Sequence, residues 1–167
     1  MEAVAGYTVV RQLDASAIWE RLLVRAPGSG AFHELVRYYP YAMSRGEFAK
    51  IQEAIARRRR IDDPRLVRIV DVLPDHEGAL CVIYDHASGG SLEAMQRKSA
   101  KGRLPLAAVL AIVRDAGRAL ASGSRATDGG AHAFLTSLGV CVDFEGRVRV
   151  EGFLVEAAEA PLESNTT

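Results

Sequence analysis

The sequence lacks the features that mark several classes of protein. Its 167 residues include only two cysteines, Cys81 and Cys141, and both lie in apolar runs typical of strands. This number and placement argue against a disulfide framework or a metal site and predict two buried free thiols. No apolar run is long enough to span a membrane, and the N-terminus lacks the basic start and long apolar stretch of a signal peptide. We therefore expect a cytoplasmic protein without membrane insertion.

A net charge is also missing. The 21 lysines and arginines balance the 21 aspartates and glutamates, so the whole chain gives no electrostatic reason to expect binding to nucleic acid. Residues 57–60 are four consecutive arginines, and one interpretation of this run is an anion-binding or nucleic-acid patch. Because Asp62 and Asp63 follow directly, we favour the alternative that the run is the solvated end of a helix.

The composition and the apolar spacing indicate one globular domain with a real core, since 49% of the residues are apolar and 25% are charged. Strands are predicted over residues 7–13, 17–25, 31–39, 66–73 and 79–86, and a hairpin joins 139–143 to 147–153. Helices are predicted over residues 44–61, 92–99 and 106–121. Ser44 and Glu47 have the spacing of a capping box. Gly89 and Gly90 are interpreted as a turn before a helix.

Four segments occur in an order that matches one known family. Residues 130–143 read GAHAFLTSLGVCVD and resemble the catalytic loop of protein kinases, in which His-Arg-Asp-Leu precedes Lys-Pro-x-Asn and an apolar strand. Residues 62–72 resemble the turn and strand after kinase helix αC, and residues 82–92 resemble the hinge and the start of helix αD. Residues 147–154 resemble the strand that leads into the Asp-Phe-Gly motif. These segments are most similar to those of bacterial Ser/Thr kinases.

The resemblance implies an α+β fold. Residues 1–86 would form a kinase-like N-lobe, a five-stranded antiparallel sheet with helix αC. Residues 87–156 would form part of a helical C-lobe with αD, αE, a catalytic-loop remnant and a β hairpin, and residues 157–167 a tail or linker. The C-lobe would be truncated, because the chain stops where a kinase begins its activation segment.

The residues that carry kinase chemistry are replaced. Phe134 stands at the position of the catalytic Asp, while Gly139 and Gly152 stand at the two positions that hold Mg²⁺. None of the three has a side-chain acceptor oxygen. The loop from Asp14 to Trp19 contains no glycine that would let backbone amides approach phosphates. The resemblance therefore implies a pseudokinase, because phosphoryl transfer depends on positioning and electrostatics.

Three residues remain as weak candidates for contact with a nucleotide. Arg37 is the only cation where the third kinase strand should supply its lysine. Tyr84 falls at the gatekeeper position, where its bulk would narrow an adenine pocket, and Asp85 follows it in the hinge. His132 is expected to be structural, as this residue is in kinases. We expect no cofactor and no measurable ATP binding.

The function that follows from the resemblance is protein–protein interaction, as a scaffold or an allosteric regulator in bacterial signalling. The candidate interface is an apolar stripe, Val109, Val113 and Leu120, on the helix predicted over residues 106–121. A partner protein or a second copy would cover it, unless the hairpin of residues 139–153 does so. The alternative is a nucleotide-binding regulator or weak Ser/Thr kinase whose phosphate site is rebuilt from Arg37 or the four arginines.

Overall fold

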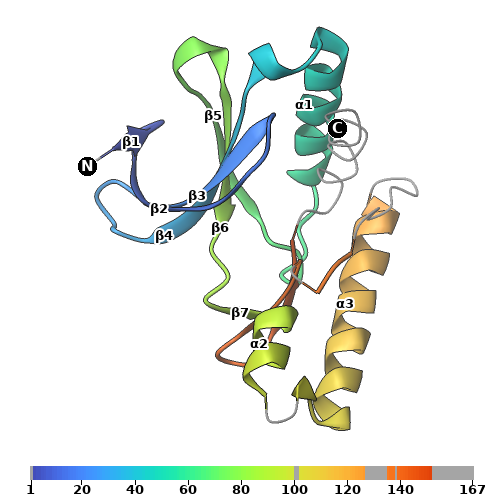
Figure 1. The fold of residues 1–167 in the computed structure, drawn as a ribbon. Helices are drawn as coiled ribbons and strands as arrows, with labels where there is room; N and C mark the ends of the chain where they lie inside the picture. The colour runs from blue at the N-terminus through green and yellow to red at the C-terminus, as the bar shows by residue number, and fades with distance from the viewer. Residues whose placement is uncertain (1, 100–101, 127–134, 138, 152–167) are drawn as a thin grey trace. The chain divides into compact units, whose positions relative to one another are not determined.

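The computed structural model describes residues 2–99, 102–126, 135–137 and 139–151 (Figure 1). They form two compact units. The first contains residues 2–53 and 68–86, and the second contains residues 54–67 and the described residues between 87 and 151. The predicted domain boundaries after residues 86 and 156 stay predictions.

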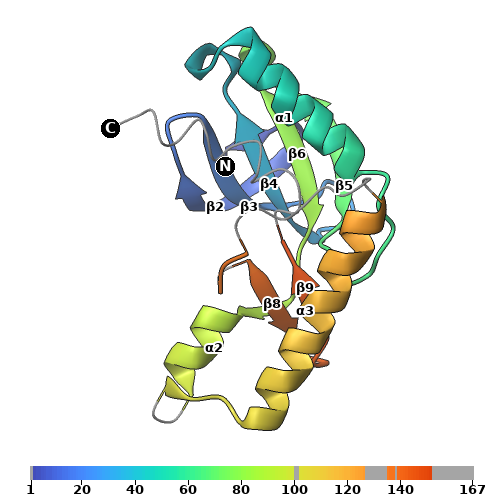
Figure 2. The same ribbon diagram turned by 90° about the vertical axis from the view of Figure 1, so that its right-hand side faces the viewer.

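The first unit is built on a six-stranded antiparallel sheet with the order β1-β2-β3-β4-β6-β5 (Figures 1 and 2). Its strands are β1 (Ala3–Val4), β2 (Tyr7–Ala15), β3 (Trp19–Arg25), β4 (Phe32–Tyr38), β5 (Ile69–Pro74) and β6 (Leu80–Asp85). All five predicted strands are present. The structure adds β1, which pairs with β2 through a turn at Ala5 and Gly6, where φ is 48° and 85°. Positive φ at both positions is typical of a two-residue hairpin, but Ala-Gly is a weak sequence signal for one.

One face of this sheet carries an apolar core. Side chains alternate between the two faces of a strand, so Leu35 of β4 and Ile83 of β6, which are paired, point to the same side. Both are completely buried in a cluster with Leu22, Val24 and Val4. Cys81 belongs to the same cluster, and Cys141 is buried elsewhere, which confirms the prediction of two buried free thiols.

Helix α1 (Arg45–Arg58) begins with the predicted capping box. The backbone N–H of Ser44 donates to Oε2 of Glu47 at 2.7 Å, and the N–H of Glu47 donates to Oγ of Ser44 at 3.3 Å. The helix ends at Arg58, three residues earlier than predicted, because the amide of Ile61 already donates to the carbonyl of Arg58 in a tighter turn. Within the described residues, none of the helices combines the length and the apolar character needed to cross a bilayer.

The second unit combines two helices with a small antiparallel sheet of order β7-β8-β9. Its elements are β7 (Gly89–Ser91), α2 (Leu92–Lys98), α3 (Leu106–Ala126), β8 (Val140–Asp143) and β9 (Val148–Val150). The hairpin of β8 and β9 confirms the predicted pairing. The interpretation of Gly89 and Gly90 as a turn was wrong, because they form β7 and pair with Asp143 and Val142. At Gly89, φ is 154° and an added Cβ would overlap the carbonyl oxygen of Val142, so only glycine fits this strand.

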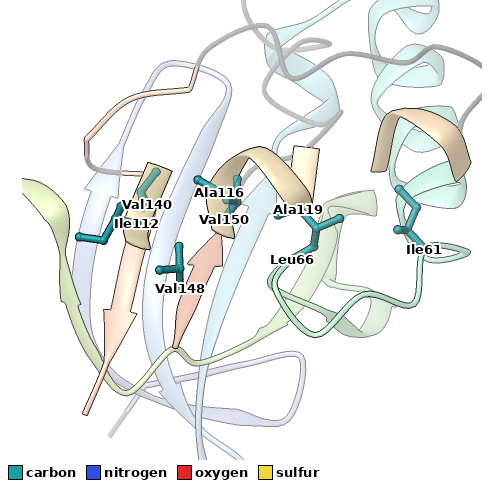
Figure 3. Packing of buried hydrophobic residues seen from close by; sticks show 8 residues of the cluster. All are labelled: Ile61, Leu66, Ile112, Ala116, Ala119, Val140, Val148 and Val150. Atoms are coloured by element: carbon teal, nitrogen blue, oxygen red, sulfur yellow. The ribbon is translucent and has the colours of Figure 1, made fainter. Parts of the chain in front are cut away.

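The core of the second unit lies between α3 and the hairpin (Figure 3). Ala119 and Val150 are completely buried there, and the cluster also contains Ile61, Leu66, Ile112, Ala116, Val140 and Val148. Residues 65–67 join the edge of the hairpin, since the amide of Val67 donates to the carbonyl of Val150 at 2.9 Å. This attachment explains why β5 begins at Ile69 rather than at the predicted residue 66.

Candidate functional site

The face of the sheet opposite the Leu35–Ile83 cluster carries a network of charged side chains beside the buried Val36, Tyr38 and Val82. Glu34 of β4 points to this face, because it is adjacent in sequence to the core residue Leu35. Nη2 and Nε of Arg21, from β3, lie 2.6 and 2.8 Å from Oε2 of Glu34. Nδ1 of His86, directly after β6, lies 3.1 Å from Oε1. Both oxygens of one carboxylate are therefore engaged.

The environment of Glu34 keeps it ionised. Its side chain is only 11% exposed. Burial alone would raise the pKa of this carboxyl, but the hydrogen bond with His86 and the charge of Arg21 outweigh burial and lower the pKa. At neutral pH, the network therefore presents a carboxylate at the centre of the face.

Tyr84 and Asp14 belong to the same face. Tyr84 of β6 is paired directly with Glu34, and Asp14 of β2 is paired directly with Arg21. Asp14 is thus a cross-strand neighbour of Arg21, while its Oδ1 accepts from the amide of Ala15 at 2.8 Å. Asp85 lies next along β6, where it pairs with His33 and points to the other face. The structure places Tyr84 beside the charged network and Asp85 away from it.

The loop that would hold phosphates is a tight turn. β2 continues through Asp14 and Ala15, which leaves only three residues before β3 begins at Trp19. The amide of Ser16 donates to the carbonyl of Trp19 at 2.8 Å, and Ile18 is buried in the turn. A turn of this length, with its backbone groups paired and a buried isoleucine, does not have the open glycine-rich form that cradles phosphate.

Arg37 is held by carboxylates on the core side of the sheet. Its position, three residues after Glu34, places it on the opposite face from the Arg21–Glu34 pair. Nη2 lies 2.6 Å from Oδ2 of Asp75, Nη1 lies 3.4 Å from Oε1 of Glu20, and the guanidinium stacks 5.4 Å from the ring centroid of Tyr39. Burial works against its charge, but Asp75 and Glu20 outweigh burial and raise the pKa of Arg37. A phosphate would have to compete with both carboxylates.

The four arginines of residues 57–60 differ in their surroundings. Arg57, Arg59 and Arg60 are exposed, as expected for a solvated helix end. Arg58 is 3% exposed and donates to the backbone carbonyls of Ile61 and Val67, so the solvated interpretation is wrong for this residue. The helical spacing in the sequence could have predicted the burial of Arg58, because this residue lies on the same helix face as the buried Ile51, Ala54 and Ile55.

Asp63 pairs with an arginine outside this run. Its two carboxylate oxygens accept from Nε and Nη2 of Arg65 at 2.9 and 2.8 Å. Burial would raise the pKa of Asp63, but hydrogen bonds from Arg65 and Ser122 lower it to about 2. The carboxylate thus fixes the loop that attaches to β9.

Of the three positions that should carry catalysis, Gly139 lies within the described residues, while Phe134 and Gly152 lie outside them. Gly139 is buried, its amide donates to Oγ1 of Thr136 at 3.2 Å, and its carbonyl accepts from the amide of Glu151 at 2.9 Å. His132 also lies outside the described part. Among residues 2–99, 102–126, 135–137 and 139–151, no three His, Cys, Asp or Glu side chains gather as metal ligands would.

The predicted interface residues of α3 differ in their exposure to solvent. Val109 and Val113 are 38% and 63% exposed, whereas Leu120 packs against the core cluster of the second unit. The hairpin contacts the face of α3 that contains Ile112, Ala116 and Ala119 (Figure 3). Leu106 and Leu110, at 73% and 60% exposed, extend the uncovered row.

Comparison with known proteins identifies the fold. No family profile and no curated protein matches the sequence. Among solved structures, the PknI kinase domain of Mycobacterium tuberculosis is 27% identical, with a TM-score of 0.73 over 92% of this chain and 60% of that one. A single mutant of that domain is 26% identical with a TM-score of 0.74, and a double mutant is 26% identical with a TM-score of 0.76, each over 92% of this chain. The match covers 61% and 62% of the length of these two mutant chains.

The chain has a protein kinase-like fold. Its six-stranded antiparallel sheet with α1 is of the kinase N-lobe type, which confirms the predicted α+β class. The chain spans about six tenths of the length of the PknI structures. Sequence reasoning missed Glu34 and His86 as parts of the charged network. An acidic residue inside the apolar strand was the available signal, since a buried charge needs a partner.

Proposed function

We propose that this protein is a catalytically inactive, kinase-like module that binds another protein in bacterial signalling, in the cytoplasm, as a scaffold or an allosteric regulator. The Arg21–Glu34–His86 network is the observation that carries the proposal. It puts a carboxylate on the sheet face beside the hinge residues, where a nucleotide would require room and positive charge. The positive charge of Arg21 on this face is paired with the carboxylate of Glu34.

The replacements at Phe134, Gly139 and Gly152 support the same conclusion. A kinase needs a base to accept the substrate proton and oxygen ligands to hold Mg²⁺, and these side chains supply neither. The three-residue turn before Trp19 adds a steric reason against phosphate binding. Together these changes remove binding and chemistry, rather than one step of a reaction.

A second candidate is a nucleotide-binding regulator or weak Ser/Thr kinase, which the similarity to the PknI kinase domain favours. It would need a cation for the phosphates. Arg37 is already paired with Asp75 and Glu20, so the exposed Arg57, Arg59 and Arg60 would have to serve.

A thermal-shift titration with ATP and Mg²⁺ separates the two candidates. A ligand at 100 times its Kd stabilises the folded state by ~2.7 kcal/mol, so even modest binding would raise the melting temperature at millimolar ATP. We expect no shift, and no difference between ATP with Mg²⁺ and ATP with a chelator. A Mg²⁺-dependent shift, lost when Arg57, Arg59 and Arg60 are replaced by Ala, would establish the second candidate instead.

A further inference from the structure

Helix α3 has two apolar faces, and only one of them is used by the core. Ile112, Ala116 and Ala119 face the hairpin and are at most 7% exposed. Leu106, Val109, Leu110 and Val113, which we call the α3 stripe, are 73%, 38%, 60% and 63% exposed. With about 100° between successive residues, the stripe forms a row next to the buried face. A row of large apolar side chains in water is typical of a docking surface.

A row of arginines follows the α3 stripe on its other side. Arg114, Arg118 and Arg125 are spaced by four and seven residues, so they lie along one line of the helix. The side chains of Arg114 and Arg118 are 58% and 60% exposed, and both contact the same acid, Asp115, at 2.8 and 3.6 Å. One carboxylate cannot balance two guanidinium groups, which leaves this edge of the helix positive.

The surrounding sequence strengthens this charge. Residues 97–125 contain seven lysines and arginines and one aspartate, a net charge of +6. The rest of the chain contains fourteen cations and twenty anions, a net charge of −6. The neutral protein is therefore divided into a basic segment, which includes α3, and an acidic remainder.

We propose that the α3 stripe and its arginine row bind an acidic amphipathic helix of a partner protein. This inference rests on the proposed function and specifies the chemistry of the protein that the module would bind. From Leu106 to Val113 the stripe covers two helical turns, and Gly117 continues it with a position where an added Cβ would meet nothing within 4 Å. That narrow row suits the apolar positions i, i+3, i+4 and i+7 of a partner helix. Acidic side chains beside them would meet Arg114 and Arg118.

A second copy of this chain is a poorer occupant. A two-fold symmetric contact through the α3 stripe would bring two segments of charge +6 together, and like charges in contact cost several kcal/mol. The area is also small. A stable interface buries ~800 Å² on each partner, whereas an exposed row of four side chains provides a few hundred Å². A bound helix of opposite charge avoids this repulsion, and its contact needs to be only as long as the stripe.

The test uses the full chain and two labelled peptides of equal length and apolar pattern. The acidic peptide carries Leu at positions i, i+3, i+4 and i+7 with Glu between them, and the basic control carries Lys in place of Glu. By fluorescence anisotropy we expect the acidic peptide to bind at least tenfold more tightly than the basic one. The preference should fall as salt rises, because charges at a solvent-exposed edge are screened.

Variants then identify the surface. Leu110→Gln with Val113→Gln should weaken the acidic peptide at least tenfold, and Arg114→Glu with Arg118→Glu should reverse the charge preference. Arg45→Glu with Lys50→Glu, at exposed positions of α1 outside residues 97–125, is the matched double charge reversal and should change binding less than twofold. Circular dichroism and the melting temperature would check that each variant is folded. We expect all of them to fold, because the substituted side chains are exposed.

Three results would overturn the inference. One is equal binding of both peptides, or of neither. Another is binding to vesicles that contain anionic lipid while the acidic peptide does not bind, which would assign the surface to membranes. The third is a stable dimer by sedimentation that Val113→Gln dissociates. Each of these leaves the thermal-shift result with ATP unchanged, so failure here is distinguishable from failure of the proposed inactive role.

Discussion

Arg21 and Glu34, on neighbouring strands, form an ion pair in which both Nη2 and Nε of the arginine face a single carboxylate oxygen, at 2.6 and 2.8 Å. The remaining oxygen is left for His86. A carboxylate shared in this way fixes β3, β4 and the segment after β6 to one another. The contacts that we propose to oppose a nucleotide thus also stabilise the sheet.

Removal of Glu34 should destabilise the protein. In Glu34→Ala, Arg21 and His86 lose their acceptor on a mostly buried face, and we expect the free energy of unfolding to fall by about 1–3 kcal/mol. Urea denaturation of Arg21→Ala, Glu34→Ala and the double variant measures the coupling between them. Additive effects of the two single changes would mean that the pair contributes nothing.

Restoring the catalytic carboxylates should not restore catalysis. Phe134→Asp with Gly152→Asp would supply a base and one metal ligand, but Glu34 and the short turn before Trp19 would still oppose a nucleotide. Transfer of labelled γ-phosphate to a generic substrate should stay at background. Turnover above that of the unchanged chain would show that these two carboxylates are sufficient and would contradict the prediction.

Arg58 and Arg59 should differ sharply on substitution, although they are adjacent. Arg58→Ala leaves the buried carbonyls of Ile61 and Val67 without this donor and should cost about 2–4 kcal/mol of unfolding free energy. Arg59→Ala, at an exposed position, should change it by less than about 0.5 kcal/mol. Chemical denaturation of both variants is the measurement, and similar small effects would contradict the structural role of Arg58.

The stability should depend on pH through Asp63. Its pKa is lowered to about 2 in the folded protein, from an ordinary value of about 3.9 when unfolded. A lowered pKa stabilises the fold above the unfolded value, and that contribution is lost as the pH falls from about 4 toward 2. Because Arg65 is partly exposed, we expect roughly 1–2 kcal/mol. The stability difference between the wild type and Asp63→Asn should be present at pH 7 and shrink below pH 4; a difference that does not change with pH would disprove this.

Two glycine substitutions should act in opposite directions. Gly117→Ala, in the middle of α3 with open space around it, should raise the free energy of unfolding by about 0.5–1 kcal/mol because alanine favours the helix. Gly89→Ala should lower the free energy of unfolding by at least about 1–3 kcal/mol, because φ at this position is positive and the new Cβ would collide with the carbonyl oxygen of Val142. Thermal and urea unfolding compare them, and a destabilising Gly117→Ala would indicate an undetected contact.

Local patterns predicted much of this fold, and pairings between distant residues account for what they missed. Alternation in the strands and the Ser44–Glu47 capping box are properties of neighbouring residues, so both were readable from the sequence. The Glu34 network depends on how β3, β4 and the residue after β6 are brought side by side, and β7 exists only because β8 lies next to it. The sequence therefore predicts the loss of the kinase functional groups, but it did not predict the Glu34 network or β7.

The two buried cysteines make the protein convenient to label. Burial, and the nearby charge of Asp75, raise the pKa of Cys81 to about 12, and the thiol of Cys141 is buried within 3.1 Å of a carboxylate oxygen of Glu151. A protonated and covered thiol reacts slowly with alkylating reagents. A cysteine introduced at an exposed position of α3 would therefore react first, and the natural sequence already serves as a cysteine-light background for attaching a dye or a spin label.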